Sequence, residues 1–202
     1  LGNLSQHHPE YSRISVLVEF IANATGASYG ILGEAANSVG AYLVGAVPEI
    51  SDLSIPKASN SIKKTGGLNA AQMLGYSTDL PDERCNALIL MNVEPEFDAY
   101  NSQQALETLK SYEFIVTMSA YKGGSSDYAD VLLPITPYTE TSGSYVNTEG
   151  RVQSFNGVVS PLGNARPAWK VLRVLANLLA VENFDYETTE QIRAEIFSNG
   201  LE

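Results

Sequence analysis

The chain has 202 residues, enough for one or two domains with an independent hydrophobic core. Its formal net charge is −11, from 12 Lys and Arg against 23 Asp and Glu, so it lacks the basic surface that nucleic-acid binding requires. The single cysteine, Cys85, excludes an internal disulfide or a four-thiolate cluster, and the only histidines, His7 and His8, make a zinc or iron site unexpected. No apolar run reaches the ~18 residues of a membrane span, and the first residues lack the layout of a signal peptide.

The N-terminal quarter predicts two helices separated by a short strand. Apolar residues follow helical spacing from Ile14 to Ile21, and Gly26 stands where a helix would end. We expect a short strand over 28–32 and a helix of small residues over 37–46. The polar stretch 50–66 has no period and predicts an exposed loop.

The middle of the chain carries the clearest strand signals. A short helix is expected over 68–74, and the unbroken apolar run 87–92 predicts a strand that is covered on both faces. Cys85, just before this run, is expected to be a packed core thiol. A helix over 102–111 then leads to a second such strand at 114–118. This alternation predicts an α/β fold in three layers, with a mainly parallel sheet flanked by helices.

After residue 120 the composition changes to many Gly, Ser, Thr and Pro residues, and the last forty residues again show helical spacing. Brief strands are expected near 131–133, 144–146 and 152–155, and two helices near 169–179 and 188–198. We therefore divide the chain into an α/β sheet core over 10–120, an irregular segment over 121–165, and C-terminal helices over 166–202.

The common catalytic and phosphate-binding motifs are missing from the sequence. Residues 30–41 are glycine-rich but match neither phosphate-loop pattern, so a tight turn before a helix is preferred over an anion site. Ser142 has no nucleophile elbow, and no histidine follows His8 to act as its base. Asp and Glu are plentiful, but no spacing selects a catalytic pair. We expect no catalytic residue and no metal ligand.

The segment 129–153 differs from the rest, because Glu140, Glu149 and Arg151 stand among many Gly, Thr and Asn residues. Such residues satisfy the backbone of an irregular path, and a carboxylate paired with Arg151 would fix that path firmly. The residue types favour a loop tied to itself on the sheet edge. A cradle for a polar ligand is the alternative.

The same segment resembles the late part of molybdopterin-dependent oxidoreductases. In that family a strand, a crossing loop and an N-x-E-G-R stretch form part of the wall beside a pterin guanine dinucleotide. The upstream ALILMNVEP and the downstream GNARPAW follow the family's order. The matching residues are Ala129, Asp130, Leu133, Pro134, Glu140, Gly143, Asn147, Glu149, Gly150, Arg151 and Gln153.

Two further stretches, GEAANSVGAYLVGAVP and GGLNAAQMLG, look like one branch of this family, the large iron–sulfur subunit of bacterial NADH-quinone oxidoreductase, respiratory complex I. The resemblance runs from about residue 10 to 182. It implies a C-terminal segment that keeps the fold, has lost the metal cofactor, and serves as scaffold, while iron–sulfur clusters lie in the N-terminal part of that large subunit. The residues implied to hold the structural motif are Asp130, Pro134, Glu140, Asn147, Glu149, Gly150 and Arg151.

Our first hypothesis is therefore a non-catalytic scaffold segment of the translocating enzyme that carries electrons from NADH to quinone. Its implied partners are the upstream part of the same subunit and other peripheral-arm subunits, with no nucleic acid and no membrane insertion. The implied location is the cytoplasmic side of the bacterial inner membrane. No cofactor is expected in the segment itself.

The alternative is a working fragment that binds molybdopterin guanine dinucleotide through the loops 33–38, 92–96 and 121–127, placed after strands. A surviving site would use Asn92, Glu94, Arg151 and Gln153. Against it, Ser126 and Asp127 stand where catalytic relatives usually carry an E-T pair. A carboxylate-based hydrolase is a third, more remote reading.

These readings predict different surfaces. The scaffold predicts an acidic or filled crevice at the three loops, whereas the cofactor reading predicts an open, positive groove with unpaired backbone N–H groups. A hydrolase would place two carboxyl groups face to face.

Overall fold

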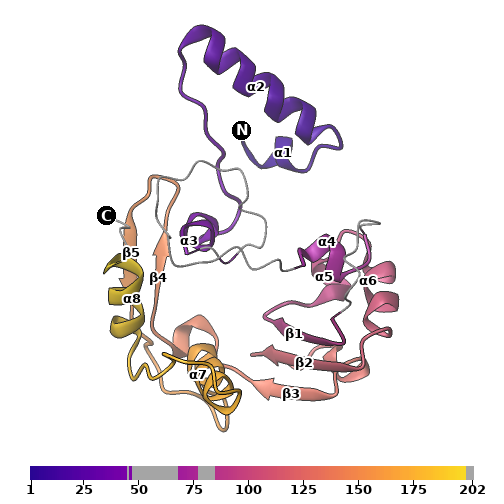
Figure 1. Cartoon of the computed structure of the whole chain (residues 1–202), viewed down its shortest axis with the longest axis vertical. Helices are drawn as coiled ribbons and strands as arrows, with labels where there is room; N and C mark the ends of the chain where they lie inside the picture. Colours follow the sequence, from indigo (N-terminus) through magenta and orange to yellow (C-terminus); the bar gives the residue numbers. More distant parts are fainter. Residues whose placement is uncertain (45, 47–67, 77–84, 199–202) are drawn as a thin grey trace. The chain divides into compact units, whose positions relative to one another are not determined.

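The computed structural model describes residues 1–44, 46, 68–76 and 85–198 (Figure 1). The predicted loop 50–66 lies outside the described residues. The chain forms two compact units, one of Leu1–Val47 with Ser144–Ser154 and one of Pro48–Gly143 with Phe155–Glu202. The division into 10–120, 121–165 and 166–202, drawn from sequence texture, stays a prediction.

The second unit contains a three-stranded sheet. Its strands are β1 (Ala87–Met91), β2 (Phe114–Ser119) and β3 (Val131–Pro134), in the order β1-β2-β3 and parallel throughout. Leu88 pairs with Ile115, so these two residues and Leu90 share one face of the sheet. The predicted α/β class with a parallel sheet flanked by helices is confirmed.

Three short helices, α4 (Ala70–Met73), α5 (Pro95–Asp98) and α6 (Ser102–Leu109), lie beside this sheet (Figure 1). Leu109 of α6 is fully buried against Leu88, Leu90 and Ile115, and Met73 of α4 joins the same cluster. The Asn101 side chain caps α6 by accepting a hydrogen bond from the backbone N–H of Gln104. Helices therefore cover one face of the sheet, and their apolar residues, which recur at helical spacing in the sequence, pack against it.

The other face of β1 is open to solvent. Ile89 is 47% exposed, Met91 44% and Phe114 45%, although Leu88 and Leu90 between them are buried. The prediction that this strand is covered on both faces is wrong for the described residues. An unbroken apolar run is typical of a strand that is buried on both faces, but here only the face of Leu88 and Leu90 is covered.

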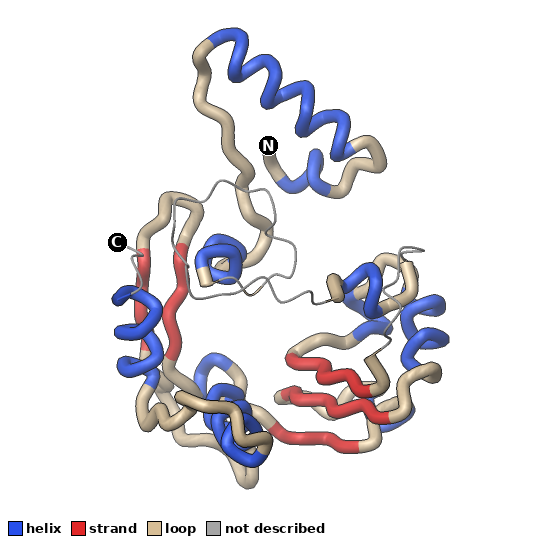
Figure 2. Tube along the Cα trace, in the orientation of Figure 1, coloured by secondary structure: helices blue, strands red, loops and turns tan. Residues whose placement is uncertain are grey.

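The irregular segment and the C-terminal helices agree with their predicted positions. The single-turn helices η1 (Ser125–Asp127) and η2 (Tyr138–Glu140) flank β3, and β4 (Gly143–Val146) pairs with β5 (Val152–Phe155) (Figure 2). The helices α7 (Ala168–Leu178) and α8 (Thr189–Ser198) follow. Pro167 immediately precedes α7, where its missing N–H costs no helical hydrogen bond.

The first unit contains α1 (Asn3–Gln6), α2 (Tyr11–Thr25) and α3 (Ser38–Leu43). Gly26 ends α2 as predicted, in a left-handed conformation with φ 70°. The Asn37 side chain accepts a hydrogen bond from the backbone N–H of Val146 at 2.8 Å, which joins the start of α3 to β4 within this unit. None of the described helices is long and apolar enough to cross a membrane.

Three local predictions are wrong. Residues 28–32 form no strand, because their backbone bonds the N-terminal turn instead: Leu32 N–H donates to Leu1 O at 2.8 Å. The helix predicted over 37–46 covers Ser38–Leu43 only. Cys85 is exposed rather than packed, since it lies before the point where β1 begins to pair.

The core can be tested with two leucines that differ in burial. Leu109→Ala removes a side chain with 0% exposure and should lower the free energy of unfolding by about 2–5 kcal/mol. Leu178→Ala, at a position 79% exposed, should change it by less than about 0.5 kcal/mol. Urea unfolding measures both, and equal losses would contradict the assigned core.

Candidate functional site

The carboxyl ends of β1, β2 and β3 meet at one edge of the parallel sheet, where α/β folds of this kind place ligands. Asn92 leaves β1 with φ 51°, a left-handed conformation that Asn tolerates better than most residues. The predicted loops 92–96 and 121–127 lie at this edge. The third, 33–38, follows no strand and belongs to the first unit, so that prediction is wrong.

Carboxylates of the loop after β1 lie against the backbone of the loop after β2. A Cβ built on Gly123 would lie 2.5 Å from Glu94 Oε1, and one built on Gly124 would lie 2.8 Å from Glu96 Oε1. Gly123 also has φ 47°, which disfavours any side chain. The two glycines thus let the carboxylates approach the main chain, and the carboxylates fill the space beside it.

Three backbone N–H groups at this edge are paired within the protein. The N–H of Glu94 donates to the Asp98 carboxylate at 2.7 Å, at the start of α5. The N–H of Tyr121 donates to Ser119 Oγ at 3.1 Å. After β3, the N–H of Thr136 donates to the carbonyl of Arg166 at 3.1 Å. These three groups are therefore not free to hold an anion.

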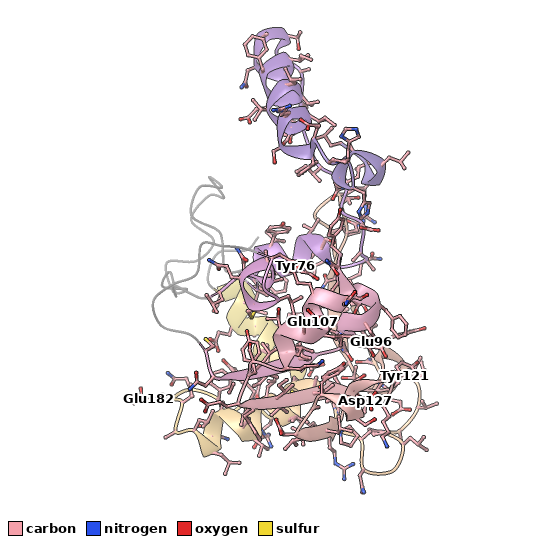
Figure 3. All side chains as sticks on the ribbon, turned by 90° about the vertical axis from the view of Figure 1, so that its right-hand side faces the viewer. Tyr76, Glu96, Glu107, Tyr121, Asp127 and Glu182 are labelled. Atoms are coloured by element: carbon pink, nitrogen blue, oxygen red, sulfur yellow. The ribbon has the colours of Figure 1, made fainter. Side chains whose placement is uncertain are left out.

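Tyr128 forms a hydrogen bond with one of the carboxylates of this edge, Glu96. Its hydroxyl donates to Glu96 Oε2 at 3.2 Å, while Glu96 Oε1 is buried and has no hydrogen-bond partner. Burial raises the pKa of Tyr128 well above its usual range, and the charge of Glu96 raises it further. Figure 3 labels Glu96, on α5, and Tyr121 and Asp127, on the segment that follows β2. The phenol is thus a neutral donor to a carboxylate that has few other partners.

The charge at the edge is negative. The residues 92–98 and 120–127 contain four carboxylates, Glu94, Glu96, Asp98 and Asp127, and one cation, Lys122. These groups do not fit a polyanionic pterin dinucleotide, because four carboxylates beside one cation repel its phosphates. Among the described residues no group of three or more His, Cys, Asp or Glu could hold a metal ion.

Asp130 and Pro134 hold β3 in place. Asp130 Oδ2 accepts a hydrogen bond from the backbone N–H of Ile115 at 2.7 Å, and the Asp130 N–H donates to Ile115 O. The carbonyl of Pro134 accepts from the N–H of Arg166, next to an isolated parallel bridge between Ile135 and Arg166. Both residues therefore accept hydrogen bonds from main-chain N–H groups, Asp130 from β2 and Pro134 from Arg166.

Glu140 ties a surface loop to η2. Its Oε2 accepts a hydrogen bond from the backbone N–H of Leu162 at 3.0 Å, and the Thr139 carbonyl accepts from Val158 N–H at 2.8 Å. A Cβ on Gly157 would lie 3.0 Å from the main chain of Glu140, so this glycine allows the close approach. The carboxylate therefore binds main chain and not an arginine.

The turn between β4 and β5 is closed by Asn147. Its Oδ1 accepts from the backbone N–H of Glu149 at 3.1 Å and of Arg151 at 2.9 Å. Gly150 has φ 81°, which the turn requires. The side chains of Glu149 and Arg151 are exposed and form no ion pair with described residues, so the predicted carboxylate–Arg151 pair is wrong.

The four residues suggested for a surviving cofactor site divide between the units. Asn92 and Glu94 belong to the second unit, and Arg151 and Gln153 to the first. Glu94 lies at the sheet edge as described, whereas Gln153 is exposed on β5.

Two contributors to the edge were not singled out from the sequence. Asp98 could have been found, because Pro95 marks a helix start and an acidic residue in the first turn is a known partner for free N–H groups. Tyr128 lies 32 positions from Glu96, and no local signal predicts that contact.

The comparison with protein-family models identifies the chain's class. Residues 2–178 match the molybdopterin oxidoreductase model, so the chain belongs to the molybdopterin oxidoreductase family.

Three relatives illustrate the range of the family. "Putative formate dehydrogenase YrhE" of Bacillus subtilis is 31% identical over 132 residues, 65% of this chain and 13% of the relative. "Putative formate dehydrogenase SAR2393" of Staphylococcus aureus is 35% identical over 131 residues, 65% of this chain and 12% of the relative. The mitochondrial "NADH-ubiquinone oxidoreductase 78 kDa subunit" of Candida albicans is 46% identical over 66 residues, 33% of this chain and 9% of that subunit. The aligned part is thus about an eighth of each relative or less.

The Tyr128–Glu96 contact predicts a change in phenol titration. Glu96→Gln should lower the pKa of Tyr128, because it removes the adjacent charge while burial remains. Tyrosinate absorbance in an alkaline titration measures this shift, and Tyr128→Phe, which deletes the step, assigns it. Identical titrations of the wild type and Glu96→Gln would contradict the contact.

The same shift makes stability depend on alkaline pH. Because the folded state holds the Tyr128 proton to higher pH than the unfolded chain does, the free energy of unfolding should fall as the pH rises above the ordinary tyrosine pKa of about 10. Tyr128→Phe should reduce this fall in urea unfolding at alkaline pH.

Proposed function

We propose that the chain is a scaffold segment of a protein like the large iron–sulfur subunit of NADH-quinone oxidoreductase, and has no redox centre of its own. The observation that supports this most strongly is the sheet edge. Carboxylates lie against its main chain, and the backbone N–H groups of Glu94 and Tyr121 have internal partners. A segment that has exchanged ligand-binding space for internal contacts suits a structural role.

The similarity to the complex I subunit also supports the proposal. Identity with the 78 kDa subunit of Candida albicans is 46% over 66 residues, against 31% over 132 residues for YrhE. In our proposal the parent protein is a redox enzyme, NADH-quinone oxidoreductase, whose iron–sulfur clusters lie in sequence outside this chain. The segment supports electron transfer from NADH to quinone without taking part in it.

We further propose that its partners are the upstream part of the same subunit and other peripheral-arm subunits. The implied location is the cytoplasmic side of the bacterial inner membrane, as a peripheral part of the complex. The net charge of −11 argues against nucleic acid as a partner.

A fragment that still binds the dinucleotide is the second candidate. The alignments with formate dehydrogenases favour it, because they cover 65% of the chain. It requires a positively charged groove, whereas the segments 92–98 and 120–127 carry four carboxylates and one cation, Lys122.

Calorimetric titration with GDP, a proxy for the guanine dinucleotide, distinguishes the two. We expect no saturable heat at about 1 mM ligand, because the carboxylates of this edge would repel the phosphates. Glu94→Gln combined with Glu96→Gln tests the cause, since removing both charges should weaken the repulsion.

Saturable binding to the wild type, lost on Lys122→Ala, would contradict the scaffold. The second candidate would then take its place. Lys110→Ala, a change of charge at the C-terminal end of α6, serves as the matched control.

A further inference from the structure

We propose that the outer edge of β1 and the apolar face beside it bind an uncharged β-strand, parallel to β1, from family sequence outside this chain. The inference rests on the proposed scaffold function and names the surface through which the segment would contact the rest of its subunit. We call the three exposed residues Ile89, Met91 and Phe114 the sheet patch.

β1 has the sequence of an interior strand but the position of an edge strand. Its residues are Ala-Leu-Ile-Leu-Met, with no charge and no proline. Edge strands in stable folds normally carry a charged residue or a proline, because their free N–H and C=O groups otherwise pair with another strand. In the described sheet β1 has β2 on one side and no strand on the other.

The opposite edge of the sheet is treated differently. Beyond β3, the main chain at Arg166 forms a parallel bridge with Ile135, and Ile135 is 1% exposed. Residues of this chain therefore lie beside the outer edge of β3. No described residue pairs with the outer edge of β1 in the same way.

The sheet patch extends this edge onto one face. Ile89 and Met91 lie on the face opposite Leu88 and Leu90, and Phe114 pairs with Ala87 beside them. Each of the three is 44–47% exposed, whereas Met118, on the same face at the far end of β2, is 1% exposed. The exposure is thus confined to β1 and the first residue of β2, where a further strand and its covering residues would lie.

Family sequence outside this chain is the occupant that best fits these observations. The aligned regions are 13% of YrhE and 12% of SAR2393, so most of the sequence of such proteins lies elsewhere. A second copy of this chain is disfavoured, because it would bring together two bodies of charge −11. A strand joined covalently would also bind at an effective concentration in the millimolar range.

The test uses the whole chain and overlapping peptides of roughly 20 residues, several times a typical strand, that tile the unaligned sequence of YrhE and of the Candida albicans subunit. Hydrogen exchange reports on the β1 amides. At about 1 mM of a binding peptide we expect their exchange to slow by about tenfold.

Two variants define the surface. Ile89→Lys and Met91→Lys place a charge in the sheet patch and should abolish protection by the peptide. Val158→Lys makes the same kind of change at a loop position that is 79% exposed and should bind as the wild type does. Using two patch variants covers the case in which one of them fails to fold.

The proposal is overturned if no peptide protects β1. It is also overturned if protection depends on the concentration of the chain itself and Ile89→Lys removes it, because the occupant would then be a second copy. GDP binding reports separately on the scaffold function: peptide protection in a chain that binds GDP would keep this surface and refute the scaffold.

Discussion

A parallel sheet must be covered on both faces, and the stability of this segment depends on how far that requirement is met. Three strands of four to six residues cannot be stable without burial. One face is buried by α4 and α6 around Leu109, and Asp130 fastens β3 to β2 through the N–H of Ile115. The face of Ile89 and Met91 is left half exposed. The fold thus depends on contacts that the described residues provide on only one side.

The carboxyl edge of the same sheet explains the functional conclusion. Edges of this kind bind ligands when loops offer free N–H groups and positive charge. Here the loops turn inward: Asp98 accepts the N–H of Glu94, and Glu94 and Glu96 press against two glycines of the neighbouring loop. Tyr128 supplies a neutral donor to Glu96. The edge is built from internal contacts, which is why we favour support over catalysis.

The sequence predicted the strands and helices well where apolar periodicity was strong. The runs at 87–91 and 114–119, and the helices α2 and α7, followed from the spacing of their own residues. Residues 28–32 look like a strand by composition, but they have no neighbouring strand to pair with, so they remain irregular. Strand formation needs a partner, and the partner is not a local property.

The motif residues illustrate the same limit. Glu140 was selected from residue types in an irregular stretch, and Asp130 and Asn147 from the family resemblance. Each of the three binds backbone. The partner chosen for Arg151 was wrong, because Asn147 closes that turn alone and leaves the guanidinium exposed. Contacts between distant positions, such as Glu96 with Tyr128, could not be predicted from the sequence, since no spacing rule links residues 32 positions apart.

The central claim is that this part of a molybdopterin oxidoreductase fold supports electron transfer without a molybdenum cofactor. Metal analysis of the native protein, purified with the subunits that remain bound to it, tests this claim most directly. The account predicts iron in stoichiometric amounts together with only traces of molybdenum or tungsten. About one atom of molybdenum or tungsten per chain, with a pterin that is released on denaturation, would contradict it.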